Sequence, residues 1–68
     1  MRVKRQLKKV SQELNQKITL RWDGLKQIIG TDTYALCIWV GDTKAVDLIL
    51  PSFNTKQEFR TLVIDRLR

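Results

Sequence analysis

Two apolar stretches, Tyr34 to Val40 and Ala45 to Leu50, are separated by the turn residues Gly41-Asp42-Thr43-Lys44. This pattern predicts a β-hairpin. The loop length matters because a shift of one residue moves every side chain of a strand to the other face. A two-residue turn would bury Asp47 among large aliphatic side chains, which is costly for an unpaired carboxylate. We therefore predict an odd loop that places Leu36, Ile38, Val40, Val46, Leu48 and Leu50 on one face and Ala35, Cys37, Trp39, Ala45, Asp47 and Ile49 on the other.

The residues before the hairpin predict a helix and a strand. Apolar residues recur at helical spacing from Val3 to Leu14, so we expect a helix over residues 2–16, with Val3, Leu7, Val10 and Leu14 as its apolar stripe. From Lys17 the period becomes two, which predicts a strand that places Ile18, Leu20 and Trp22 in the core. Residues 25–29 are consistent with one helical turn, capped by Asp23 and ended by Gly30, or with an irregular loop.

The residues after the hairpin predict a second helix. Pro51 ends the last strand, because proline cannot donate a backbone hydrogen bond. Thr55 and Glu58 then have the spacing of a capping box, and the helix after them has an apolar stripe of Phe59, Leu62, Val63 and Leu67. The expected fold class is α+β, in the order helix, strand, strand, strand, helix. Residues 1–68 form a single small domain with a three-stranded, mostly antiparallel sheet.

The stabilisation of this domain has to come from its core or from a partner. The chain has 68 residues, one cysteine and no histidine, so it can form neither an internal disulfide nor the usual zinc sites. One face of the hairpin belongs to the core under the second helix. Trp39 and Ile49 make the other face too apolar for free exposure, so we expect a cover. The candidates are the helix over residues 2–16, which we favour, a second copy of the chain, and a ligand.

The positive charge is concentrated at the start of the chain. Residues 1–21 carry the whole net charge of +6, because they contain seven basic residues and one acidic residue, Glu13. In the remaining residues the basic and acidic side chains are equal in number. An anionic partner is therefore drawn to this segment. We predict that the chain binds DNA or RNA without sequence specificity, through phosphate contacts from Arg2, Lys4, Arg5, Lys8 and Lys9, supplemented by Lys17 and Arg21. An acidic protein would satisfy the same charges.

Two further roles are open for the apolar features. Trp39 on the second hairpin face is a candidate for stacking on bases or for a protein interface. The alternative function is therefore a protein interaction or regulatory module, such as a homodimer formed through the stripe of the first helix or through the Trp39 face. The narrow aliphatic stripe makes a weak membrane anchor, and we expect no membrane partner.

Catalysis is not expected. Without histidine there is no imidazole base for a serine or cysteine nucleophile, and Cys37 is expected to be a small core residue with a raised pKa and little reactivity. Asp42-Thr43-Lys44 has the spacing of a nuclease carboxylate and lysine, with Asp32 or Asp47 as a second carboxylate, but it is also ordinary turn sequence, which we favour. We predict no cofactor, no metal and no small-molecule substrate. No signal peptide or membrane span is evident, so the expected localisation is cytoplasmic.

The order of elements resembles that of the double-stranded-RNA-binding domain, and Val40-Gly41-Asp42-Thr43 is similar to a hairpin sequence of that family. The family holds phosphates with a basic, alanine-rich start of its second helix, whereas this chain has Thr55-Lys56-Gln57-Glu58-Phe59 there. The hairpin and the segment from Phe53 to Phe59 also resemble the three-stranded arm-binding domains of phage-type integrases. Both resemblances are to nucleic-acid binders.

Overall fold

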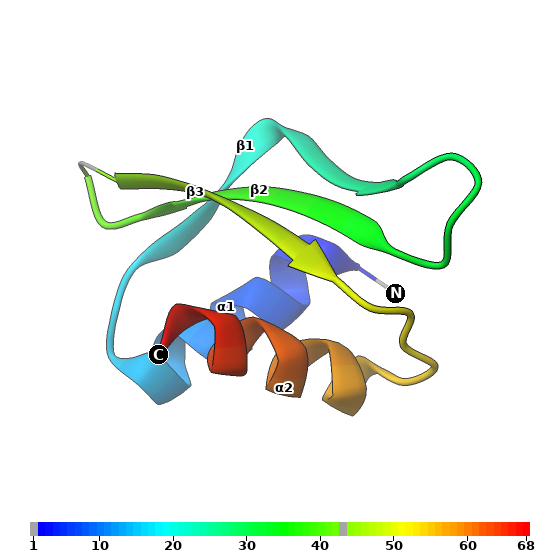
Figure 1. Ribbon diagram of the computed structural model, residues 1–68. Coiled ribbons are helices and arrows are strands. Elements are labelled where there is room, and N and C mark those ends of the chain that lie inside the picture. Colours follow the sequence, from blue (N-terminus) through cyan, green and yellow to red (C-terminus); the bar gives the residue numbers. More distant parts are fainter. Residues whose placement is uncertain (1, 43) are drawn as a thin grey trace.

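The computed structural model describes residues 2–42 and 44–68 as a three-stranded sheet with two helices on one of its faces (Figure 1). The elements follow in the order α1 (Val3–Leu14), β1 (Ile18–Gln27), β2 (Tyr34–Val40), β3 (Lys44–Leu50) and α2 (Lys56–Leu67). The sheet is antiparallel, with the strands in sequence order and β2 in the middle. The predicted α+β fold is therefore confirmed.

The hairpin of β2 and β3 has the odd loop that the position of Asp47 requires. Val40 pairs with Lys44 and Cys37 pairs with Asp47, so an odd number of residues separates the paired ends of the two strands. Thr43 itself and the side chain of Lys44 lie outside the described part of the chain. This register keeps Leu36, Ile38, Leu48 and Leu50 buried on one face of the sheet and leaves the Asp47 side chain 72% exposed on the other.

Both helices cover the same face of the sheet. Leu7 and Val10 of α1 and Phe59 and Val63 of α2 are buried in one cluster with the buried strand residues. The prediction that the first helix covers the Trp39 face is therefore wrong. Its apolar stripe packs on the large aliphatic side chains of the core face, where it also contacts α2. Within the chain, the stripe therefore packs in the core, where Leu7 and Val10 are buried.

A bulge in β1 overturns two predictions for residues 22–29. Leu20 pairs with Ile38 but Leu25 pairs with Leu36, so the register shifts between them. Gly24 adopts a left-handed conformation at φ 64° within this bulge, which glycine tolerates well. Leu25 thereby occupies the core face, and Trp22 is 89% exposed rather than buried. The expected helical turn does not form, because β1 continues to Gln27.

The helix ends follow the sequence signals closely. At the start of α2 the Glu58 backbone N–H donates to Thr55 Oγ1 at 3.1 Å. The Glu58 carboxylate accepts from the Asn54 backbone N–H at 3.3 Å, one residue before the one a capping box would use. Helix α1 ends at Leu14, two residues before the predicted end, and its C-cap Asn15 is left-handed at φ 54°. The capping prediction is confirmed, with this one change of partner.

Two polar residues have surroundings that the sequence did not indicate. Gln6 is 1% exposed, and its Oε1 accepts a hydrogen bond from Arg60 Nη1 of α2. Cys37 is only partly buried, on the face of the sheet away from the helices, so it is not a core residue. A hydrogen bond to Asp47, followed by partial burial, raises the pKa of the Cys37 thiol.

Candidate nucleic-acid interface

Five of the seven predicted phosphate-binding residues lie on the solvent side of α1 or at its N-cap. Leu7 and Val10 turn toward the core and are buried. The helical periodicity then directs the basic side chains outward, and all of them are exposed: Arg2, Lys4, Arg5, Lys8 and Lys9. Arg2, Lys4, Arg5 and Lys8 line one shallow depression together. Four of the predicted cations therefore share one concave patch, and Lys9 lies outside its lining.

None of these cations is neutralised by a carboxylate in the described part of the chain. The two ion pairs there are Arg21 with Asp47 and Lys26 with Asp23, and both belong to the sheet. Glu13 is one turn from Lys9 along α1 but makes no ion pair with it among the described residues. The positive charge of α1 therefore faces solvent.

The local electrostatics of α1 disfavour this arrangement of charge. Lys4 and Arg5 are in the first turn, which contains no acidic residue, although the N-terminal end of a helix dipole is itself positive. Lys4 and Lys8 are one turn apart, and like charges at this spacing destabilise an isolated helix by about 0.2–0.5 kcal/mol. A bound anion would offset both effects, since helix N-termini also present free backbone N–H groups.

Lys17 lies at the opposite end of α1, beyond its last turn. Its backbone carbonyl accepts from the Gly41 N–H at 2.7 Å, which ties the start of β1 to the hairpin loop. Next to this position, Gln16 shares a pocket with Arg66 of α2 and with Arg68, the C-cap of α2. Figure 1 shows the C-terminal ends of the two helices side by side. Lys17 is therefore separated from the cationic depression of α1 by the length of the helix, about 18 Å.

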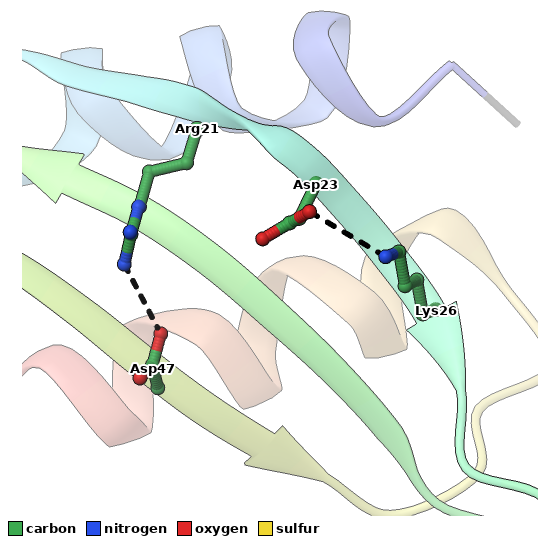
Figure 2. Close-up of polar contacts among 4 residues, drawn as sticks. All are labelled: Arg21, Asp23, Lys26 and Asp47. Atoms are coloured by element: carbon green, nitrogen blue, oxygen red, sulfur yellow. Dashed lines mark hydrogen bonds and ion pairs between the residues drawn. The ribbon is translucent and has the colours of Figure 1, made fainter.

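Arg21 and Trp39 lie on the other face of the sheet. Thr19 pairs with Trp39, and Arg21 contacts Asp47 at 3.7 Å between Nη1 and Oδ1. Figure 2 shows Arg21 reaching from β1 across β2 toward Asp47 on β3. The structure therefore separates Arg21 and Trp39 from the cations of α1, and a ligand lying along α1 would not contact them.

Helix α2 adds cations that the predicted set omits. Residues 2–17 and 55–68, which form the helical layer, contain ten of the 13 basic residues and three of the seven acidic ones. The helical layer thus has a net charge of +7, and the sheet with its loops has −1. The added basic residues are Lys56, Arg60, Arg66 and Arg68. The sequence shows how many basic residues this segment has. Which face of the molecule they occupy depends on how α2 packs.

The described residues do not gather into a metal site or a membrane span. No group of three or more histidine, cysteine or acidic side chains is placed to hold a metal ion there. No described helix has the length and apolar character needed to cross a bilayer. The acidic turn residue Asp42 is described, but its suggested partners Thr43 and the Lys44 side chain lie outside the described part.

No protein-family model, no curated protein and no solved structure matches this chain.

Proposed function

We propose that the protein binds the phosphate backbone of DNA or RNA through the outer side of α1. The observation that carries this proposal is a group of exposed cations on α1 and at its N-cap. None of them pairs with a carboxylate in the described part of the chain: Arg2, Lys4, Arg5, Lys8 and Lys9. Phosphate contacts need positioned cations and no particular base, so the binding is non-catalytic and carries no sequence preference.

The layered distribution of charge supports a nucleic acid lying against the helices. The net charge of +7 on the helical layer attracts a polyanion to that side, whereas the sheet side has no net attraction. Lys17, Arg66 and Arg68 extend the positive surface to the far end of both helices. A longer duplex or single strand would reach these residues, and a short one would contact α1 alone.

The proposal predicts how strongly the binding affinity depends on salt concentration. Each neutralised phosphate releases a counterion, so about four contacts give a slope near −3.6 for log affinity against log salt on duplex DNA. We expect single- and double-stranded oligonucleotides to bind with slopes of this order, measured by fluorescence anisotropy from low to moderate salt. Polyglutamate serves as a competitor that tests whether phosphate is preferred over carboxylate.

The decisive comparison uses two variants with the same change in charge. In Lys4→Gln/Lys8→Gln both substitutions fall in the depression of α1, and in Arg66→Gln/Arg68→Gln both fall at the end of α2. The first should lower the magnitude of the slope by about 1.8 on a short duplex, and the second should change it little. Equal effects of the two variants, or an affinity independent of salt, would contradict the proposal.

A further inference from the structure

The face of the sheet away from the helices, which we call the open face, has three cross-strand rows. Thr19, Trp39 and Ala45 form the first row, Cys37 and Asp47 lie in the second, and Lys26, Ala35 and Ile49 form the third. Arg21 reaches into the second row to contact Asp47. The open face thus has apolar side chains near its two ends, with the Lys26–Asp23 ion pair beside one of them, and the Arg21–Asp47 ion pair across its middle.

The apolar part of the open face is exposed to solvent in the single chain. Trp39 is 38% exposed and Ile49 is 52% exposed. Both helices pack on the opposite face, so neither element covers these side chains. Among the described side chains the face has no net charge, because Arg21 and Lys26 are balanced by Asp23 and Asp47, so these side chains do not attract a polyanion. A partner for this face needs apolar surface and charges of both signs.

We propose that the partner is a second copy of the chain, packed open face to open face about a two-fold axis that runs along β2. This axis places β1 of one copy over β3 of the other. Arg21 of each copy then lies over Asp47 of the other, so the middle row becomes a set of four alternating charges. The intrachain contact at 3.7 Å, with Asp47 72% exposed, leaves the carboxylate accessible for a second guanidinium.

The charges also disfavour the arrangement in which the axis crosses β2 at a right angle. A two-fold axis in the interface plane and perpendicular to β2 would place Arg21 over Arg21 and Asp47 over Asp47, which is repulsive. With the axis along β2, the remaining rows also match. Trp39 meets Trp39 of the second copy, the two small side chains of Ala35 meet, and the aliphatic stem of Lys26 covers Ile49. Cys37 lies next to the axis and faces Cys37 of the second copy.

The size of the face makes the dimer reversible. Strands β2 and β3 have seven residues each, so three strands of this length give a flat area of about 330 Å². A stable interface buries about 800 Å² on each partner. The open face falls well short of this area, and we expect a dimer that dissociates on dilution.

Charge exchange tests whether the open face forms the interface. Sedimentation equilibrium of the full chain, without nucleic acid, should show a dimer fraction that rises with concentration. Arg21→Asp and Asp47→Arg should each be monomeric at the same concentrations, and an equimolar mixture of the two should form a dimer again. Circular dichroism verifies that both variants fold, as expected because exposed ion pairs contribute little to folding.

Cross-linking at Cys37 gives a second readout that does not depend on affinity alone. A short bismaleimide that spans the roughly 10 Å between packed sheets should join two copies through Cys37. The reaction is run at mildly alkaline pH, since the hydrogen bond to Asp47 raises the pKa of this thiol. The matched control is Cys37→Ser/Thr61→Cys, which moves the only thiol to an exposed position on α2 and should not cross-link.

Two results would overturn the inference. A chain that stays monomeric up to millimolar concentration has no such interface. A dimer that persists in Arg21→Asp and Asp47→Arg, or that cross-links equally through Thr61→Cys, uses another surface. Because these measurements contain no nucleic acid, their failure would leave the proposal for α1 unaffected.

Discussion

The hydrogen bond from Arg60 to Gln6 is expected to couple the two helices energetically. Gln6 is 1% exposed, and its Oε1 accepts from the guanidinium of Arg60, 54 residues away in the sequence. Hydrogen bonds to charged groups contribute about 1.5–3 kcal/mol, and we expect the lower end because Arg60 is only partly buried. At about 0.05–0.15 kcal/mol per residue, the whole chain of 68 residues has about 3–10 kcal/mol of stability. This one contact is therefore a considerable part of the total.

A double-mutant cycle with Gln6→Met and Arg60→Met measures the coupling. Methionine keeps the length of each side chain and removes its hydrogen bond. Arg60→Met should cost more than Gln6→Met, since it leaves the buried Gln6 oxygen unpaired, at about 1–3 kcal/mol. Arg60 released by Gln6→Met can turn to solvent. Urea unfolding is followed by far-ultraviolet circular dichroism, because Trp22 and Trp39 are 89% and 38% exposed and report poorly on the core.

The expected coupling energy is about 1.5 kcal/mol. A value below about 0.5 kcal/mol, which is within the additivity of independent sites, would show that apolar contacts alone hold α1 against α2. The cations of α1 would then owe their position to Leu7 and Val10 and not to this hydrogen bond.

Three further predictions follow from local geometry. Thr55→Ala removes the acceptor for the Glu58 N–H, so thermal denaturation should show a loss of about 1 kcal/mol, or about 4–8 °C in Tm. Trp22→Ser should change the urea unfolding free energy by less than about 0.5 kcal/mol, because this side chain is 89% exposed; a larger loss would place it in the core after all. The raised pKa of the Cys37 thiol favours its neutral form in the fold. That stabilisation is present at neutral pH and is lost as the pH rises through the raised pKa, so above the ordinary value of 9.0 the protein should lose stability relative to Cys37→Ser. Parallel pH curves for the two proteins would contradict this assignment.

The parts of the fold that the sequence predicts are those in which one residue decides between alternatives. Asp47 decides the register of the hairpin, because only an odd loop keeps its carboxylate in solvent. Thr55 and Glu58 fix the start of α2 by a local hydrogen bond. The bulge in β1 was missed because the alternation of apolar residues continues through Trp22, although Gly24 marks the position. The buried Gln6 is equally hidden, because its partner is on another helix.

The grouping of the candidate site depends on a contact that a sequence pattern does not contain. The stripe of α1 shows that the helix needs a neighbour, and it does not show which face of the sheet supplies it. On the Trp39 face, α1 would have lain beside Arg21, and one surface would have held all the predicted cations. On the core face it lies beside α2, so Arg21 is left with Asp47 and Arg60 joins the helical layer. The residues were identifiable from charge, but their grouping required the packing.

The same cations that would bind phosphate also work against the fold. A net charge of +7 on the helical layer repels itself, and this repulsion destabilises the compact state. Added salt screens such charges over about 10 Å at 0.1 M, so it should stabilise the fold, whereas it weakens phosphate binding by competing for the same sites. Lys4→Gln/Lys8→Gln removes two of these charges and should therefore be more stable than the parent chain while binding more weakly. If that variant is more stable and also binds more weakly, unfolding cannot explain the lower affinity. The lower affinity then reflects lost phosphate contacts.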